Sequence, residues 1–179
     1  MHKYYIFDMD GTLCESMHFW RGALSDCGGD MRRVLEFMRE RDTHDIQLKS
    51  GAAEFIENAQ RSGIKTCIAS ATDRWISQPF LDRTGLMSGM EFYVDCTEIG
   101  VHKSDPQFYV RTAQILGADI AECAVFEDAP YCAESAKRAG FFTVGVIDRI
   151  TSKEGDLTQW CDVIVNNISE FDETEMLAT

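Results

Sequence analysis

The sequence contains no Cys-X-X-Cys pair, although it has seven cysteines. An odd number of cysteines without close pairs argues against a disulfide framework and against a structural zinc site. Three of them, Cys67, Cys96 and Cys123, lie inside strand-like runs, so we interpret them as reduced thiols of the core. This usage is typical of a reducing compartment, and we expect a cytoplasmic protein.

The sequence also lacks an apolar run long enough to span a membrane, and a charged residue, Asp8, interrupts the first run too early for a signal peptide. Basic residues are few: 17 Lys and Arg stand against 30 Asp and Glu, for a formal charge of -13. Because this field repels polyanions, we expect neither nucleic acid nor an anionic membrane as a partner. An anionic substrate would need a local cation, either a metal ion or a fixed Lys or Arg.

The chain has 179 residues, of which 45% are hydrophobic, enough for one core and a small insertion. Short β-prone runs alternate with helical patterns along most of the sequence. This alternation predicts an α/β fold with a parallel sheet that is covered by helices on both faces. We expect strands at residues 3–8, 65–70, 91–96, 123–128, 141–146 and 162–167.

Glycine and proline mark the expected helix boundaries. Helical patterns end at Gly63, Gly117 and Gly140, each shortly before a predicted strand. Pro79 interrupts the segment 74–84, because proline in a helix interior lacks a hydrogen-bond donor. We therefore expect a loop or turn first and a helix from about residue 79 onward.

The interval from Cys14 to Ser50 does not follow the alternation, because it contains two amphipathic patterns and no strand. We interpret it as a helical hairpin inserted after the first strand, with Gly28-Gly29-Asp30 as its turn and as the cap of its second helix. The expected domains are a catalytic core of residues 1–13 and 51–179 and a short helical cap of residues 14–50.

Polar and charged side chains gather where the predicted strands end. In an open parallel sheet, ligands bind beyond the carboxyl ends of the strands, so these side chains should meet there. Each has an ordinary explanation when taken alone, as an Asp-Gly turn, a helix start or a surface lysine. Clustered carboxylates, however, imply a hard divalent cation, and oxygen ligands favour Mg²⁺ over Ca²⁺. The set consists of Asp8, Asp10, Ser70, Lys103, Glu127 and Asp128.

Taken in chain order, this set resembles the four motifs of the haloacid dehalogenase-like hydrolase superfamily. Residues 8–13, DMDGTL, resemble the first motif, Ser70 the second, Lys103 the third and Glu127-Asp128 the fourth. The resemblance implies a three-layer Rossmann-like sheet with the strand order 3-2-1-4-5, which would bring Asp8 beside Asp128. It also implies the phosphatase and phosphomutase branch, whose helical cap follows the first strand.

The resemblance further implies a mechanism. Asp8 would attack phosphorus to form an aspartyl-phosphate, and Asp10 would act first as acid and then as base. Haloacid dehalogenases proper lack this second aspartate, so Asp10 favours phosphoryl transfer over dehalogenation. By the same resemblance, phosphate would be bound by Thr12, Ser70 and Lys103, and Mg²⁺ by Asp8, Asp10, Glu127 and Asp128.

The cap is shorter than the family's usual one, with 37 residues between Leu13 and Gly51. Two short helices cover only one side of a pocket, so we expect an open entrance and broad specificity unless a second subunit of a homo-oligomer closes it. In related sugar phosphomutases a histidine would fall where Trp20 stands, which favours a phosphatase. Packing in the hairpin core is an equally good explanation of Trp20. Candidate substrate contacts are Ser16, His18, Trp20 and Arg74.

Three classes of function follow. The first is a Mg²⁺-dependent phosphatase that acts on a small phosphorylated metabolite. The second is a phosphomutase or another phosphotransferase that uses the same aspartyl-phosphate. The third is a non-catalytic protein that keeps the fold to bind a partner, although such a protein would not need the chemically demanding residues. The sequence does not specify the leaving group.

Overall fold

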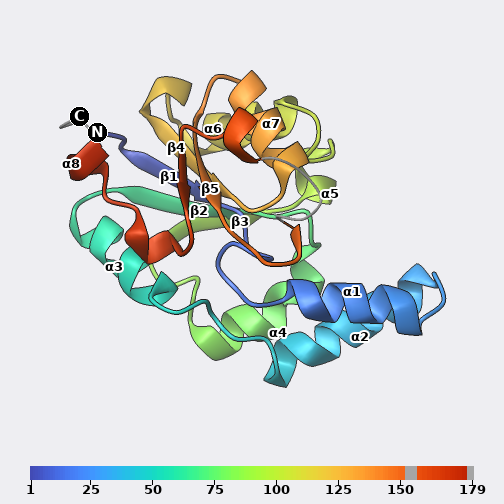
Figure 1. Cartoon of the computed structure of the whole chain (residues 1–179). Coiled ribbons are helices and arrows are strands. Elements are labelled where there is room, and N and C mark those ends of the chain that lie inside the picture. Colours follow the sequence, from blue (N-terminus) through green and yellow to red (C-terminus); the bar gives the residue numbers. More distant parts are fainter. Residues whose placement is uncertain (152–156, 177–179) are drawn as a thin grey trace.

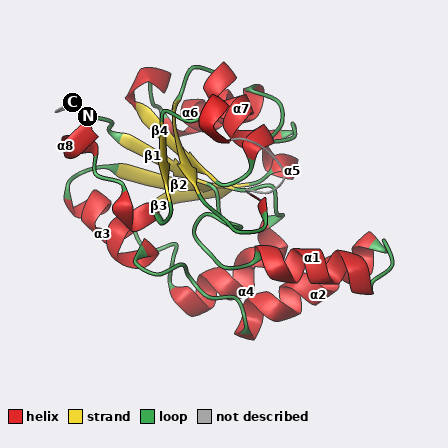
Figure 2. Ribbon diagram, in the orientation of Figure 1, coloured by secondary structure: helices red, strands yellow, loops and turns green. Residues whose placement is uncertain are grey.

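The structure, a computed structural model, describes residues 1–151 and 157–176. In this part of the chain, six parallel strands form one sheet in the order β3-β2-β1-β4-β5-β6, with helices on both faces (Figures 1 and 2). The predicted α/β class and the order 3-2-1-4-5 are confirmed, and β6 extends the sheet beside β5. The strands are β1 (Tyr4–Phe7), β2 (Lys65–Ala69), β3 (Met90–Val94), β4 (Cys123–Glu127), β5 (Phe142–Val146) and β6 (Val163–Val165).

The central strand, β1, determines where the acidic motif lies. Phe7 pairs with Ile68 of β2 on one side and with Phe126 of β4 on the other. The backbone N–H of Asp8 then donates to the Phe126 carbonyl oxygen at 3.0 Å. Because the strands are parallel and in this register, Asp8 leaves β1 at the same edge where Asp128 follows β4.

The helices and the 3₁₀ helices fill the intervals between the strands. None of the helices in the described residues is both long enough and apolar enough to cross a membrane. Their bounds are α1 (Met17–Asp26), α2 (Met31–His44), α3 (Ala52–Arg61), α4 (Arg74–Thr84), α5 (Cys96–Ile99), α6 (Gln107–Leu116), η1 (Ile120–Glu122), α7 (Pro130–Arg138), η3 (Leu157–Gln159), η4 (Ile168–Glu170) and α8 (Glu173–Met176).

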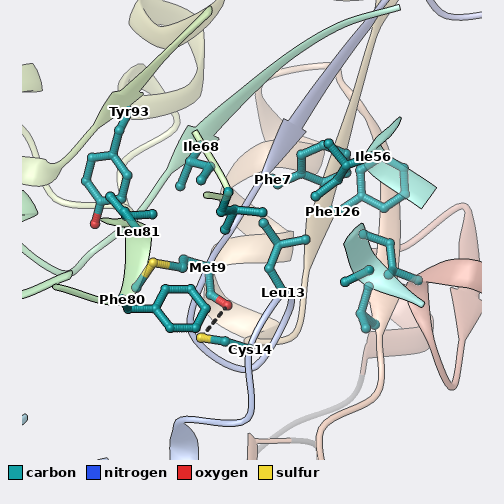
Figure 3. Packing of buried hydrophobic residues seen from close by; sticks show 14 of the residues in the cluster. Phe7, Met9, Leu13, Cys14, Ile56, Ile68, Phe80, Leu81, Tyr93 and Phe126 are labelled. Carbon is teal, nitrogen blue, oxygen red and sulfur yellow. Dashed lines mark hydrogen bonds between the residues drawn. The ribbon is translucent and has the colours of Figure 1, made fainter. Parts of the chain in front are cut away.

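The alternation of side chains along β1 divides the core into two layers. Tyr5 and Phe7 point to the layer covered by α3, α4 and η4, whereas Ile6 points to the layer covered by α5, α6 and α7. Figure 3 shows Phe7 and Phe126 packed in the first of these layers. Aliphatic and aromatic side chains thus bury both faces of the sheet, and the polar groups are left at its carboxyl edge.

The predicted helical hairpin is present as α1 and α2. Gly28 and Gly29 adopt positive φ angles of 59° and 83°, and the Asp30 carboxylate accepts hydrogen bonds from the first turn of α2. A glycine tolerates positive φ without strain, so the Gly-Gly pair allows the tight turn. The division at residues 14–50 stays a prediction, although the linkers at Cys14 and Leu48 do run antiparallel to each other.

The cap packs against α4 of the core. Val34 and Met38 of α2 are fully buried in the same apolar cluster as the α4 residue Phe80. The Arg39 guanidinium lies 5.6 Å from the centre of the Trp75 ring, and a further arginine, Arg83, donates to a carbonyl oxygen at the end of the cap. Figure 1 shows α2 running beside α4. The cap therefore shares a buried apolar interface with the core.

The prediction of a loop before Pro79 is wrong, because α4 runs without a break from Arg74 to Thr84. Pro79 lies in the second turn, so the helix loses only the hydrogen bond that residue 79 would donate to Trp75. The buried side chains Ile76 and Phe80 lie on either side of it and hold the helix against the core. Tertiary packing here outweighs the local preference.

Pro79→Ala should stabilise the protein. Alanine restores the missing donor and has a better helix propensity, whereas the greater freedom of the unfolded chain offsets part of the gain. We expect an increase of about 1–2 kcal/mol in the free energy of unfolding, measured by urea denaturation. The matched control is Pro130→Ala, because Pro130 is at the first position of α7, where proline is favourable. A loss of stability in Pro79→Ala would contradict this account of α4.

Candidate active site

A cleft of about 690 Å³ lies beyond the carboxyl ends of β1, β2 and β4. The α1–α2 hairpin forms one wall, and the start of α7 with the segment around Trp160 forms the other. All of the expected strand-end residues line this cleft, whereas Thr12 does not. They are Asp8, Asp10, Ser70, Lys103, Glu127 and Asp128.

Lys103 is at the centre of the cleft floor and is almost completely buried. Its ammonium group donates to Asp8 Oδ1 at 2.7 Å and to the Ala69 carbonyl oxygen at 2.9 Å, and it forms an ion pair with Glu127. Burial alone would lower the pKa of Lys103, but the carboxylates of Asp8 and Glu127 outweigh it and raise that pKa well above its ordinary value. Lys103 is therefore a fixed positive charge.

The carboxylates of Asp8, Glu127 and Asp128 form a buried acidic cluster. One oxygen from each residue lies within 4.8 Å of the others. Within the described residues, Asp8 Oδ2, Glu127 Oε2 and Asp128 Oδ2 are buried without a hydrogen-bond partner. Burial, reinforced by the charge of Asp8, raises the pKa of Asp128 well above its usual range and that of Glu127 to about 7.

This cluster fits a divalent cation. Unpartnered buried carboxylate oxygens are costly, and a hard cation with oxygen ligands would satisfy them together. Lys103 already occupies Asp8 Oδ1 and contacts Glu127, so the remaining oxygens define where the cation would bind. The donor set contains neither histidine nor cysteine, which disfavours zinc.

Asp10 is held from two sides. Trp20 Nε1–H of the cap donates to Asp10 Oδ1 at 3.0 Å, and Thr72 Oγ1–H donates to Asp10 Oδ2 at 2.7 Å. Burial raises the pKa of Asp10, although these two donors and Ser16 act in the opposite direction. Trp20 also packs against the core cluster and lines the cleft. One side chain therefore combines packing with a direct contact to Asp10.

Gly11 allows the chain to turn between the two aspartates. Its φ is +87°, and a Cβ atom there would lie 2.2 Å from Asp128 Oδ2. The carbonyl oxygen of Met9 accepts hydrogen bonds from the N–H groups of Leu13 and Cys14, which closes the turn. Only glycine permits both the backbone angle and the close approach of Asp128.

The sequence model of a family described as haloacid dehalogenase-like hydrolase matches residues 30–140. The chain belongs to this family. The match includes Ser70, Lys103, Glu127 and Asp128 and begins after Asp8 and Asp10. The strand order, the acidic cluster and the buried lysine of this chain agree with the resemblance seen in its sequence.

Two curated relatives are from Bacillus subtilis (strain 168). The putative phosphatase YhcW is 32% identical over 104 residues, which is 58% of this chain and 47% of that protein. Beta-phosphoglucomutase is 28% identical over 124 residues, covering 69% and 51% of the two chains. The chain thus spans about half the length of these curated relatives. A crystal structure of CbbY from Rhodobacter sphaeroides in complex with xylulose-(1,5)bisphosphate shares the fold, with a TM-score of 0.82 at 18% identity. The similarity covers 95% of this chain and 96% of that chain.

The remaining predicted site residues lie outside the cleft lining. Thr12 is buried, and its hydroxyl donates to Asp128 Oδ1 at 3.4 Å. Ser16 is buried next to Cys14, His18 is exposed with its ring against Phe19, and Arg74 is exposed and donates to Gln78. Their roles in binding stay predictions. Of the four candidate substrate contacts, the structure brings only Trp20 to the cleft.

Two hydroxyl groups at the site had no role predicted from the sequence. The Tyr109 hydroxyl, fully buried on α6, donates to Glu127 Oε1 at 2.6 Å, and Thr72 binds Asp10. A tyrosine six residues after Lys103, on an otherwise apolar stripe, was the available signal for Tyr109. Tyr131, in the first turn of α7, also lines the cleft.

Asp128→Asn should stabilise the cation-free protein but abolish stabilisation by a cation. Burial and the neighbouring carboxylates raise the pKa of Asp128 in the folded state, so the folded state loses stability as the pH rises above the unfolded pKa, and the repulsion grows as Asp128 ionises. Removing it should add about 1–3 kcal/mol in EDTA. Millimolar Mg²⁺ should raise the melting temperature of the wild type and not that of the variant.

The control for this experiment is Asp26→Asn, which removes one charge from an exposed position on α1. It should show the wild-type response to Mg²⁺ and little change in EDTA. An equal Mg²⁺ response in Asp128→Asn and the wild type would exclude Asp128 from the cation site.

Proposed function

We propose that this chain is a Mg²⁺-dependent phosphatase that hydrolyses a small phosphorylated metabolite through an aspartyl-phosphate on Asp8. The observation that carries the proposal is the environment of Asp8 at the cleft floor. One carboxylate oxygen is paired with Lys103, and the other is without a partner in the described residues, next to Glu127 and Asp128. The names of the curated relatives, a putative phosphatase and a phosphomutase, support phosphoryl chemistry.

In the first step, a carboxylate oxygen of Asp8 attacks phosphorus, and the ester P–O bond breaks. Asp10 gives its proton to the leaving oxygen, so that an alcohol departs. Lys103 and the hydroxyl groups of Ser70 and Thr12 would bind the phosphoryl oxygens and balance their charge. Ser70 lines the cleft, whereas Thr12 would have to release Asp128 to make this contact.

In the second step, water attacks the phosphorus of the aspartyl-phosphate, and Asp10 takes a proton from that water. The bond between the Asp8 oxygen and phosphorus breaks, inorganic phosphate leaves, and the Asp8 carboxylate is restored. Trp20 and Thr72 hold the Asp10 carboxylate between them and thus orient it for both proton transfers. The one-sided cap leaves the floor accessible to the water that this step consumes.

The Asp8, Glu127 and Asp128 carboxylates would hold Mg²⁺, together with the backbone carbonyl of Asp10. A bound magnesium ion supplies positive charge next to the transferring phosphoryl group and neutralises the acidic cluster. Its preference for oxygen ligands agrees with the donor set of the cluster.

A phosphomutase that uses the same aspartyl-phosphate is the second candidate, supported by the similarity to beta-phosphoglucomutase. Trp20 favours the phosphatase, because an indole only donates a hydrogen bond and cannot exchange a proton as a histidine does. Formation of an isomer without release of inorganic phosphate would identify the mutase. A binding protein without catalysis would release no phosphate from any member of a metabolite panel.

Asp8→Asn should abolish phosphate release while the fold is retained, since the amide has nearly the same shape but cannot attack phosphorus. We expect a loss of about 10³-fold or more in kcat with Mg²⁺, measured with a panel of phosphorylated metabolites. Circular dichroism and the melting temperature monitor folding, and Asp26→Asn serves as the charge control. Substantial residual turnover in Asp8→Asn would falsify the assignment of the nucleophile.

Asp10→Asn should impair substrates in proportion to their need for an acid. Alkyl phosphates release a poor leaving group, so their turnover should fall by about 10²–10⁴-fold, whereas p-nitrophenyl phosphate should lose much less. The measurement is kcat/KM for both substrate types in the wild type and the variant. Equal losses for the two types would mean that Asp10 does not act as a general acid.

A further inference from the structure

The outer part of the cleft differs from its floor, because its walls are apolar. Met17, Leu24, Met31 and Leu35 of the hairpin line one side, and Tyr131 and Trp160 line the other. Leu24, Met31 and Tyr131 are about half exposed, at 48%, 51% and 50%. Large apolar side chains left in contact with solvent around one cleft indicate a binding surface.

Charge in the cleft is confined to the phosphoryl end and is mostly negative. Among the described residues that line it, Lys103 is the only Lys or Arg, and two carboxylates already pair with it. Among the described residues, a second phosphate on the substrate would therefore find no lining Lys or Arg at the outer walls. The nearby Arg138 is already paired with Glu134 and lies 5.6 Å from the centre of the Trp160 ring. The hydroxyl groups of a sugar would be desolvated against the hairpin without matching polar side chains.

We propose that the substrate is the monophosphate of an apolar alcohol, with an aromatic ring or a comparable hydrophobic group that fills the outer cleft. This inference rests on the proposed function, because the phosphate must lie at Asp8. Trp20, Tyr131 and Trp160 offer aromatic surface between the floor and the rim, which suits a ring. The reaction is hydrolysis of the ester with water to the free alcohol and inorganic phosphate.

The size of the cleft agrees with such a substrate. Its 690 Å³ lies within the range of small-molecule sites, about 300–1,000 Å³, and leaves room beyond a phosphoryl group. Instead of broad specificity, we expect a preference for phosphate esters of hydrophobic alcohols. The open entrance would admit many phosphate esters, and the apolar walls would select among them.

The test is a series of primary phosphate esters: ethyl, butyl, hexyl and 2-phenylethyl phosphate. All release a primary alcohol of similar acidity, so differences in kcat/KM report on contacts with the walls. We expect kcat/KM to rise by about 10- to 100-fold from ethyl to 2-phenylethyl phosphate, as expected for burial of a phenyl-sized group. Glucose 6-phosphate and fructose 1,6-bisphosphate should be poorer than 2-phenylethyl phosphate. Equal rates along the series, or a preference for the sugar phosphates, would overturn the proposal.

A binding measurement separates this inference from the proposed function. Calorimetry with ethylphosphonate and 2-phenylethylphosphonate, in the presence of Mg²⁺, needs no turnover. If no ester is hydrolysed but the phenyl compound binds at least tenfold more tightly, the phosphatase proposal fails and the apolar site stands. If esters are hydrolysed and the two phosphonates bind equally, the apolar site is rejected and the phosphatase stands.

The double variant Leu24→Gln/Met31→Gln tests the hairpin wall. Both side chains are about half exposed, so the polar replacements should not prevent folding. The ratio of kcat/KM for 2-phenylethyl over ethyl phosphate should fall by about tenfold. The control is Ile115→Gln on α6, a large exposed apolar residue (56%) outside the cleft lining, which should keep the wild-type ratio.

Sedimentation velocity of the same variants tests the main alternative occupant, a second copy of the chain. A wild-type dimer that Leu24→Gln/Met31→Gln dissociates, with no change in the ratio of ester rates, would assign the apolar rim to a subunit interface and overturn the substrate proposal. A concentration-independent monomer with a reduced ratio in the double variant supports it.

Discussion

The buried ammonium group of Lys103 is the interaction on which the geometry of the site depends. It contacts Asp8 after β1, Ala69 at the end of β2 and Glu127 at the end of β4. Groups at the ends of three strands thus contact one positive charge. A buried lysine without partners would lose its proton, and the two carboxylates without the lysine would repel each other, so neither half of the arrangement is stable alone. The order of the sheet makes the pairing feasible, because β1 lies between β2 and β4.

The polar floor and the apolar outer walls of the cleft have different origins. The floor is built from strand ends, and its residues are those that resemble the family motifs in the sequence. The walls come from the hairpin and from the segment around Trp160, where no motif applies. Trp20 connects the two regions, since its indole N–H binds Asp10 while its ring faces the cleft. The proposed chemistry would thus depend on the strand ends of the sheet, whereas the proposed selection of the alcohol would depend on the hairpin.

Much of this arrangement could be predicted from the sequence, because its signals are local. Uninterrupted β-prone runs such as Tyr4–Phe7 and the Gly28-Gly29 turn need no knowledge of distant residues. The helix through Pro79 was missed because packing of Ile76 and Phe80 against the core overrides a local rule. The hydrogen bonds that Tyr109 and Thr72 make to acidic residues were missed because they are long-range contacts. Each joins residues that are 18 or 62 positions apart, and no spacing along the sequence encodes such a contact.

The packing of α2 on α4 affects the lifetime that the proposed aspartyl-phosphate would have. Swinging the cap away would expose Val34 and Met38, at a cost of about 3–6 kcal/mol for the two side chains, so that fewer than about one molecule in a hundred would be open. Because the cap also covers just one side, it would neither open wide nor close fully during turnover. Solvent would stay in contact with the aspartyl-phosphate throughout, and the lifetime of that intermediate would be set by water rather than by the movement of a lid.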